Sequence, residues 1–328
     1  MKNVAIIMGG YSSEYQISLK SGNVVYRNLD NTKYNLYRVH IFKEKWVMVT
    51  DDETEYPINK HDFSVDDYNG SKLTFDVVFN AIHGTPGEDG LFLAYLELLG
   101  IKHTSCTHYL SALTFNKRDF LSVLKPYGIK MATSQYINLD DAINEEAILN
   151  KIGLPCFVKP NRAGSSFGIS KVKTKEELAP AIEKAFTEDS EILIESFLDG
   201  IEVSVGVINY KGVVTVLPMT EIVSENEFFD YDAKYLGKSQ EITPARIADK
   251  LTEKVAATAK RIYEVLKIEG LTRSEFIIVD NEPYLLELNT VPGLTAESIL
   301  PQQAREAGIS LQELFDNAIE LALNKKQK

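Results

Sequence analysis

Cysteine is scarce in this chain of 328 residues, in which only Cys106 and Cys156 occur. Two isolated cysteines offer neither a disulfide framework nor the close ligand spacing of a structural zinc site. Small disulfide-stabilised folds are therefore excluded. We expect reduced thiols and a cytoplasmic location, because disulfides are rare in that compartment.

Long apolar segments and an excess of positive charge are also missing. No apolar run approaches the roughly 20 residues that span a bilayer, and the opening MKNVAIIMGG has too short an apolar stretch for a signal peptide. The 35 Lys and Arg residues are outnumbered by 47 Asp and Glu, which gives a net charge of −12. This balance disfavours nucleic acid and anionic membranes as partners, since both attract basic surfaces.

Several familiar catalytic motifs are absent as well. The sequence contains no Ser-His-Asp order, CxxC pair, HExxH or GxGxxG. The Gly/Ser-rich stretch VKPNRAGSSFGIS (158–170) is not a P-loop, because Lys159 precedes its glycines whereas a P-loop lysine follows them. Its backbone N–H groups could still bind phosphate, although a lysine at a strand end is more often a surface residue. Both interpretations of Lys159 stay open at this point.

What the sequence does contain is a regular alternation of strands and helices in residues 1–105. Apolar runs at 3–8 and 76–82 predict buried strands, and the segments 14–29 and 90–100 predict helices. This order predicts a parallel sheet flanked by helices, with ligand-facing loops at the carboxyl ends of its strands.

Two loops follow predicted strands at that edge, GGYSSEYQIS (9–18) and HGTPGEDG (83–90). Glu14 fits either a functional acid or an acid at a helix N-terminus, where the helix dipole favours negative charge. His83 fits either a substrate contact or a histidine whose hydrogen bonds are satisfied within the protein. Lys117, which opens a later amphipathic helix, is most simply an exposed lysine.

The rest of the chain divides into two further regions. Residues 106–198 are predicted to form helices first and then strands, whereas residues 199–328 begin with the two-residue period of antiparallel strands. A polar aromatic loop, ENEFFDYDAKYLGKSQE (225–241), interrupts the third region and is typical of a lid. A long helix, a hairpin and a terminal helix are predicted to follow.

The predicted hairpin RSEFIIVDNEPYLLELN concentrates polar side chains. If residues 280–282 form its loop, Glu275 lies opposite Glu287 and Arg273 opposite Asn289, all on one face. Two carboxylates and an amide form a hard-oxygen ligand set suited to Mg²⁺. A solvated sheet face is the alternative, although two facing glutamates repel unless a cation lies between them. Spacing alone leaves both interpretations open.

Eight blocks of the sequence occur together in the order found in one family. They are GGYSSEYQISLKSG, HGTPGEDG, YLELLGI, SALTFNK, GLPCFVKPNRAGSSFGISKV, LIESFLDGIEVSV, FFDYDAKY and YLLELNTVPGLTAESILP. Through these blocks the chain resembles the D-alanine–D-alanine ligases of the ATP-grasp superfamily over nearly its whole length.

The resemblance implies an α/β fold in three parts. These are an N-terminal, Rossmann-like parallel-sheet (pre-ATP-grasp) domain that binds substrate (1–105), a central ATP-grasp subdomain (106–198) and a C-terminal ATP-grasp subdomain (199–328). The third part would contain the lid loop (about 224–240) and the metal-binding hairpin.

The resemblance also implies a two-step reaction in peptidoglycan precursor synthesis, and hence a role in cell-wall formation and cell shape. ATP phosphorylates the carboxylate of one D-alanine, and the amine of a second D-alanine attacks the acyl phosphate, giving D-alanyl-D-alanine, ADP and phosphate. Two Mg²⁺ ions, for which Mn²⁺ can substitute, are implied as cofactors, and a homodimer as the assembly.

Three alternatives stay open beside this reaction. The chain could take D-lactate or D-serine as its second substrate, could be another ATP-grasp carboxylate–amine ligase, or could be a catalytically inactive nucleotide-binding protein. The retained metal and phosphate residues argue against an inactive protein. The lid residues Lys234 and Tyr235 favour the dipeptide product.

Individual roles follow from the resemblance by position. The residues implied to bind ATP are Lys117, Lys159, Glu195, Ser196, Phe197, Leu198, Glu202 and Lys234. Those implied to hold Mg²⁺ are Glu275, Glu287 and Asn289. Those implied to bind the two D-alanines are Glu14, His83, Lys234, Arg273, Ser298 and Ile299. The implied catalytic residues are Glu14, Ser165, Tyr235, Arg273 and Gly293, with Arg273 and the Gly293 N–H stabilising the oxyanion.

Two positions depart from the family pattern. Glu275 stands where the family usually has Asp, so the charge is kept but an extra methylene alters the reach of the metal ligand. Gln16 stands where many members have a second glutamate near the Glu14 equivalent.

Overall fold

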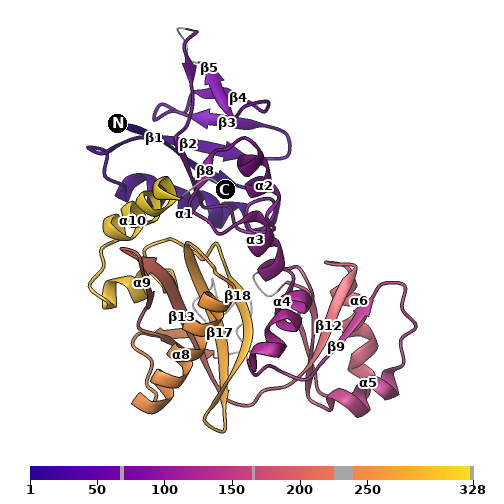
Figure 1. Cartoon of the computed structure of the whole chain (residues 1–328). Helices are drawn as coiled ribbons and strands as arrows, with labels where there is room; N and C mark the ends of the chain where they lie inside the picture. The colour runs from indigo at the N-terminus through magenta and orange to yellow at the C-terminus, as the bar shows by residue number, and fades with distance from the viewer. Residues whose placement is uncertain (67–69, 165–166, 225–238, 326–328) are drawn as a thin grey trace.

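Three β-sheets organise the chain in the computed structural model, which describes residues 1–66, 70–164, 167–224 and 239–325 (Figure 1). In Figure 1 the first sheet lies at the top, and the second and third sheets lie side by side beneath it. The predicted α/β fold is confirmed. The domain boundaries at 105/106 and 198/199 stay predictions.

The first sheet has eight strands in the order β6-β5-β4-β3-β2-β1-β7-β8. Strands β2, β1, β7 and β8 are parallel, which agrees with the predicted parallel sheet, although only β1 and β7 were predicted as individual strands. Beyond β2 the sheet continues through strands that were not predicted from the sequence. These strands are antiparallel, because the connections between them are too short for a parallel crossover. The strands are β1 (Lys2–Gly9), β2 (Tyr34–Ile41), β3 (Trp46–Val49), β4 (Glu55–Asn59), β5 (Ser64–Asp66), β6 (Lys72–Leu73), β7 (Val77–Asn80) and β8 (Lys102–His103).

Helices from opposite ends of the chain cover one face of this sheet. Helix α1 (Tyr15–Asn28) and helix α10 (Leu311–Asn324) lie side by side there and share a core with β1 and β7 (Figure 1). Phe315 of α10 meets Phe79 of β7 edge-on, with ring centroids 5.7 Å apart. Helix α2 (Leu91–Leu98) packs on the opposite face. The C-terminal helix therefore belongs to the core of the first sheet.

The second sheet is antiparallel, in the order β11-β10-β12-β9. Along β10 the side chains alternate: Cys156 and Val158 pack under two helices, whereas Phe157 and Lys159 line a cavity on the other side. The elements are β9 (Ser134–Asn138), α5 (Glu145–Ile152), β10 (Cys156–Pro160), β11 (Ser170–Val172), α6 (Leu178–Phe186) and β12 (Glu191–Ser196).

The third sheet has the order β16-β15-β13-β17-β18, with β14 pairing to β13. Its strands alternate between apolar side chains beneath a long helix, α8, and polar side chains on the other face. The elements are β13 (Ile201–Tyr210), β14 (Val213–Val216), β15 (Thr220–Ser224), β16 (Ser239–Ile242), α8 (Asp249–Val265), β17 (Leu271–Val279) and β18 (Glu282–Asn289).

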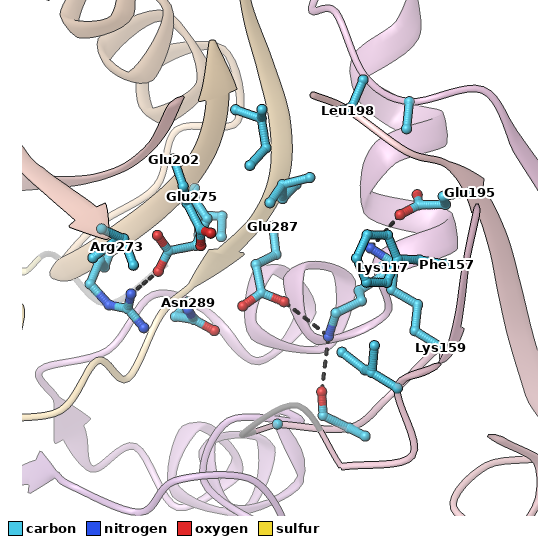
Figure 2. A pocket seen from close by; sticks show the side chains of 18 of the residues that line it. Lys117, Phe157, Lys159, Glu195, Leu198, Glu202, Arg273, Glu275, Glu287 and Asn289 are labelled. Atoms are coloured by element: carbon cyan, nitrogen blue, oxygen red, sulfur yellow. Dashed lines mark hydrogen bonds and ion pairs between the residues drawn. The ribbon is translucent and has the colours of Figure 1, made fainter. Parts of the chain in front are cut away.

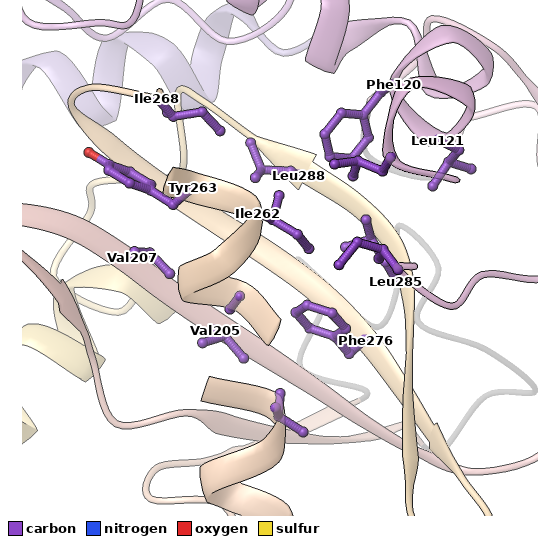
Figure 3. Close-up of a cluster of buried hydrophobic side chains, with 14 of the residues drawn as sticks. Phe120, Leu121, Val205, Val207, Ile262, Tyr263, Ile268, Phe276, Leu285 and Leu288 are labelled. Carbon is purple, nitrogen blue, oxygen red and sulfur yellow. The ribbon is translucent and has the colours of Figure 1, made fainter. Parts of the chain in front are cut away.

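The core under α8 also fixes the helix that leads into the second sheet. Phe276 of β17 lies at its centre, and Phe120 and Leu121 of α4 (Lys117–Leu124) pack beside Leu288 of β18 (Figure 3). Helix α4 follows α3, which spans His108–Phe115. This packing holds the first turn of α4 at the border between the second and third sheets.

No helix within the described segments combines the length and the apolar character that crossing a bilayer requires.

Replacing Phe276 by alanine tests the core under α8. Because Phe276 is fully buried, we expect Phe276→Ala to lower the free energy of unfolding by about 3–5 kcal/mol. Val213→Ala is the control, since Val213 is 64% exposed and surface substitutions usually change stability by less than about 0.5 kcal/mol. Urea denaturation followed by circular dichroism measures both. Equal effects of the two substitutions would contradict this core assignment.

Candidate active site

A cavity of about 560 Å³ lies between the second and third sheets and reaches the loops of the first (Figure 2). It brings together predicted site residues from all three parts of the chain. Those that line it are Glu14, His83, Lys117, Lys159, Glu195, Ser196, Phe197, Leu198, Glu202, Arg273, Glu275, Glu287, Asn289 and Gly293.

The β17–β18 hairpin supplies four of these side chains. Glu275 pairs with Glu287 and Arg273 with Asn289, as the sequence predicted. In Figure 2 all four point into the cavity from the third sheet. The hairpin therefore places two carboxylates, an amide and a guanidinium within one small polar surface.

The predicted three-residue turn at 280–282 is wrong. Asp280 and Asn281 alone form the turn, with φ angles of 49° and 61°. Asp and Asn tolerate this left-handed conformation better than most residues. A two-residue turn would shift the pairing by one residue, but a β-bulge at Leu286 shifts it back. The predicted pairing of Glu275 with Glu287 is nevertheless right. The one extra residue that the prediction placed in the turn lies in the strand instead, as the bulge.

The bulge also places Leu286 in the cavity, where the sequence analysis did not expect it. Leu285 and Leu288 face the core under α8, whereas Leu286 and Glu287 both line the cavity. A regular strand would have put Leu286 and Glu287 on opposite faces. The doublet Leu285-Leu286, which breaks the alternation of the strand, is the signal that could have revealed this.

Lys117 connects the second and third sheets across the cavity. Its Nζ lies 3.2 Å from Oε2 of Glu287 and donates to the carbonyl of Ala163 at 2.9 Å (Figure 2). Lys117 is the first residue of α4, and the preceding Asn116 caps that helix by accepting from the N–H of Asp119. The interpretation of Lys117 as an exposed lysine is wrong, since it is 9% exposed.

Lys159 is likewise buried rather than on the surface. It forms an ion pair with Glu195 on the neighbouring strand β12, and both side chains are almost inaccessible (Figure 2). Buried charges persist in proteins when they are paired. The end of β10 thus fixes a second positively charged side chain on the cavity wall.

The donor set on the hairpin fits a divalent cation. Glu275 pairs with Arg273 through Oε1, whereas its Oε2 is buried with no hydrogen-bond partner among the described residues. A buried unsatisfied acceptor costs free energy, and a cation would remove that cost. Glu287 and Asn289 add oxygens of the kind that Mg²⁺ prefers.

The hairpin alone would not complete a metal coordination sphere. Within the described ranges, no group of three or more His, Cys, Asp or Glu side chains is arranged to hold a metal ion. Mg²⁺ usually takes one or two protein carboxylates and completes its shell with phosphates and water. The hairpin therefore suits a metal that arrives with a phosphate ligand.

Glu14 lies against the Gly/Ser loop that follows β10. A Cβ built at Gly164 would fall 2.5 Å from Oε2 of Glu14, so only glycine permits this approach. Glu14 immediately precedes α1, but its side chain forms no cap hydrogen bond on that helix. The carboxylate therefore faces the cavity and the loop, which favours the functional interpretation of Glu14.

His83 is satisfied by hydrogen bonds within the protein. Nδ1 lies 2.9 Å from the carbonyl of Val291, which can only accept, so the proton resides on Nδ1. Nε2 then accepts from the hydroxyl of Ser21 at 3.0 Å, and that oxygen accepts from the N–H of Leu294. Burial lowers the pKa of His83 despite the nearby Glu14 carboxylate. A neutral His83 thus ties the first sheet to the loop after β18.

Glu88 is a cavity residue that the sequence analysis did not assign to the site. Helix α2 begins only at Leu91, and the Glu88 carboxylate turns back to accept from the N–H of Gly84 at 3.1 Å. Burial raises the pKa of Glu88 to about 7, and the Glu14 carboxylate adds to the rise. No local sequence pattern distinguishes this arrangement from an exposed helix cap.

The cavity lining also has an apolar part. It includes Phe157, Leu198, Ile222 and Leu286, and Glu202 of β13 adds a further acid to the lining. A ligand with a planar apolar part and an anionic part would match both regions, and a nucleotide has this character.

Two described residues among those predicted do not line the cavity, Ser298 and Ile299. Ser298 and Ile299 lie at the start of helix α9 (Ile299–Glu306), where a Cβ at Gly293 would be 2.8 Å from Oγ of Ser298. Ser165, Lys234 and Tyr235 fall outside the described residues, as does most of the predicted lid.

Two family models match the chain, and relatives with established names resemble it closely. The models are described as D-ala D-ala ligase N-terminus, over residues 3–106, and D-ala D-ala ligase C-terminus, over residues 123–320. A D-alanine–D-alanine ligase of Flavobacterium johnsoniae is 72% identical across 98% of this chain and 100% of its own length. That of Christiangramia forsetii is 62% identical across 99% of each chain.

Solved structures agree over the same length. The VanG D-Ala:D-Ser ligase from Enterococcus faecalis is 31% identical, with a TM-score of 0.85 across 98% of this chain and 99% of that one. A D-alanine–D-alanine ligase from Bacillus anthracis, solved in complex with ATP, is 30% identical, with a TM-score of 0.79 across 98% of each chain.

The buried carboxyl of Glu88 predicts a pH dependence of stability. Its pKa rises from an ordinary 4.5 to about 7 on folding, so between these values the folded chain holds a proton that the unfolded chain has released. Stability should therefore increase as pH falls from 7 to 4.5 through this group. Melting temperatures of wild type and Glu88→Gln, measured in EDTA from pH 8 to 5, isolate the effect. Parallel curves for the two proteins would contradict it.

Proposed function

The chain belongs to the D-alanine–D-alanine ligase family, and on this premise we propose that it joins two D-alanine molecules in an ATP-dependent reaction. The reaction proceeds through a D-alanyl phosphate and releases ADP and phosphate. One observation carries the proposal: a single cavity holds the hairpin carboxylates, Lys117, Lys159, Arg273 and Glu14.

The chemistry explains why these charges are needed together. A carboxylate is a poor electrophile, so phosphoryl transfer from ATP converts its oxygen into a leaving group. Phosphoryl transfer depends on positioning and on stabilising negative charge. Lys117 and Lys159 face the cavity from two elements and bind the ATP phosphates, while the segment Glu195–Leu198 and Glu202 bind the nucleoside.

Glu275, Glu287 and Asn289 hold Mg²⁺ in this proposal. When bound, Mg²⁺ neutralises charge on the ATP phosphates. Arg273 already pairs with Glu275, and Lys117 with Glu287. These two ion pairs orient the carboxylates. A second Mg²⁺ and substitution by Mn²⁺ are part of the proposal, as is the longer reach of Glu275 where the family usually has Asp.

The two D-alanines are assigned to separate sets of binding residues. Glu14 binds the ammonium of the first, close to His83. Ser298 and the N–H of Ile299 bind the carboxylate of the second, and Arg273 with the Gly293 N–H stabilises the oxyanion formed when its amine attacks.

The lid and the assembly complete the proposal. Ser165, Lys234 and Tyr235 retain the roles that the resemblance implies, with the lid excluding water from the acyl phosphate. The division into domains 1–105, 106–198 and 199–328 is proposed with them. We also include a homodimer, and a cytoplasmic role in peptidoglycan precursor synthesis.

D-serine is the second candidate for the attacking substrate, because one similar structure is that of a D-Ala:D-Ser ligase. The two candidates share the first half-reaction and differ only in the nucleophile. Product analysis therefore separates them.

The condensation assay tests the proposed activity. Purified protein with ATP, Mg²⁺ and D-alanine should form D-alanyl-D-alanine and ADP in equal amounts, and L-alanine should form no dipeptide. Mixtures of D-alanine with D-serine or D-lactate, analysed by mass spectrometry, report the preferred second substrate. Faster formation of a mixed product at equal concentrations would overturn the dipeptide assignment.

Glu287→Gln tests the metal assignment. Loss of the charge should lower turnover roughly 100-fold and raise the Mg²⁺ concentration needed for half-maximal rate, because metal stabilisation of phosphoryl charge weakens. Glu282→Gln is the matched control on the same strand. Glu282 pairs with Lys130 and Lys254 away from the cavity, and exposed pairs contribute little. An unchanged Mg²⁺ requirement in Glu287→Gln would refute the ligand assignment.

A further inference from the structure

Helix α9 is anchored to the cavity face of the third sheet by a buried glutamine that no role yet explains. Gln303 is fully buried. Its amide nitrogen donates to the carbonyl of Ser204 at 2.8 Å and to the hydroxyl of Thr220 at 3.0 Å. These two bonds link one helix to two adjacent strands, β13 and β15.

The same serine also holds the side chain assigned to the oxyanion. Nη1 of Arg273 donates to Oγ of Ser204 at 3.3 Å, and Ser204 is itself fully buried. The backbone of Ser204 thus binds Gln303 while its side chain binds Arg273. Ser204 therefore connects α9 to Arg273 through one residue.

The helix face that bears Gln303 continues to the helix start. Ile299 and Gln303 are four positions apart and therefore share a face. Ile299 packs against Ile222 of β15. The residue before Gln303 forms another hydrogen bond. The amide nitrogen of Gln302 donates to the carboxylate of Glu241 on β16 at 3.2 Å, which links α9 to a third strand.

Helix α9 approaches the sheet closely at a glycine. A Cβ at Gly206 would lie 2.6 Å from Oε1 of Gln303 and 2.7 Å from Cδ1 of Leu300. Both contacts are tighter than real Cβ atoms adopt, so a side chain at position 206 requires the ends of the Gln303 and Leu300 side chains to shift.

We propose that Gln303 is a positioning residue that fixes the distance between the start of α9 and Arg273. The inference rests on the proposed function, in which the start of α9 binds the carboxylate of the second D-alanine and Arg273 stabilises the oxyanion. Gln303 is not among the residues that line the cavity. It sets where the second amine stands relative to the reacting carbonyl, and a small misplacement there is costly to rate.

Gln303→Met tests the proposal while keeping side-chain volume. Loss of both hydrogen bonds should raise KM for the second D-alanine roughly 10-fold and lower kcat, because orientation of the amine degrades. KM for ATP and for the first D-alanine should change by less than about twofold, since their residues are held by other elements. The two D-alanine constants come from initial rates fitted to a two-site rate equation at saturating ATP.

Asn317→Leu is the matched control. Asn317 is a buried amide on α10 that donates to the carbonyl of Asn209 and accepts from the N–H of Lys211, at the far end of the same strand β13. It should lower the melting temperature as Gln303→Met does, without moving either D-alanine KM. A merely structural role for Gln303 predicts the same kinetics in both variants.

Gly206→Ala provides an independent route, because its Cβ displaces the end of the Gln303 side chain from its hydrogen-bonded position without removing that residue. It should reproduce the selective rise in KM for the second D-alanine. If Gln303→Met does not fold, the kinetics of Gly206→Ala test the inference in its place. The inference is overturned if whichever variant folds keeps wild-type KM values, or if KM rises equally for ATP and for both D-alanines. Neither outcome overturns the proposed function. If wild type itself forms no dipeptide, the proposed function fails and the inference falls with it.

Discussion

Glu275 and Glu287 stand opposite each other on the β17–β18 hairpin, and carboxylates held so close repel unless positive charge balances them. The surrounding structure supplies that charge. Arg273 pairs with Glu275, and Lys117, brought in by α4 from the edge of the second sheet, pairs with Glu287. The Glu275 oxygen left without a partner among the described residues is where, in the proposed function, a metal would add positive charge. The proposed Mg²⁺ would bring phosphate ligands to the same surface.

The same constraint explains why the cavity lies where all three sheets meet. No single sheet contributes the hairpin carboxylates, the two cavity lysines Lys117 and Lys159, and the Glu14 carboxylate. Their relative positions depend on contacts between distant segments, such as Glu14 against Gly164 and His83 with Val291. His83 is neutral and fully hydrogen-bonded, so it can hold the loop containing Gly293 next to the first sheet without adding charge to a crowded site.

Local patterns predicted most strands and helices, because alternation and capping depend on neighbouring residues. They failed where tertiary contacts decide. The hairpin register was predicted from a three-residue turn, yet it arises from a two-residue turn and a bulge that also turns Leu286 into the cavity. Burial of Lys117 and the cavity position of Glu88 depend on segments distant in sequence. The packing of α10 on the first sheet was likewise invisible, since an amphipathic helix does not reveal which sheet it covers.

The fate of the D-alanine carboxylate oxygens tests the central claim most directly. If the charged cavity serves to form a D-alanyl phosphate, D-alanine labelled with ¹⁸O in its carboxylate must transfer one labelled oxygen to the released phosphate for each peptide bond formed. Mass spectrometry of the phosphate measures this transfer. The account predicts one ¹⁸O per phosphate, with ADP as the other product. Unlabelled phosphate formed together with dipeptide, or label appearing in AMP, would contradict it.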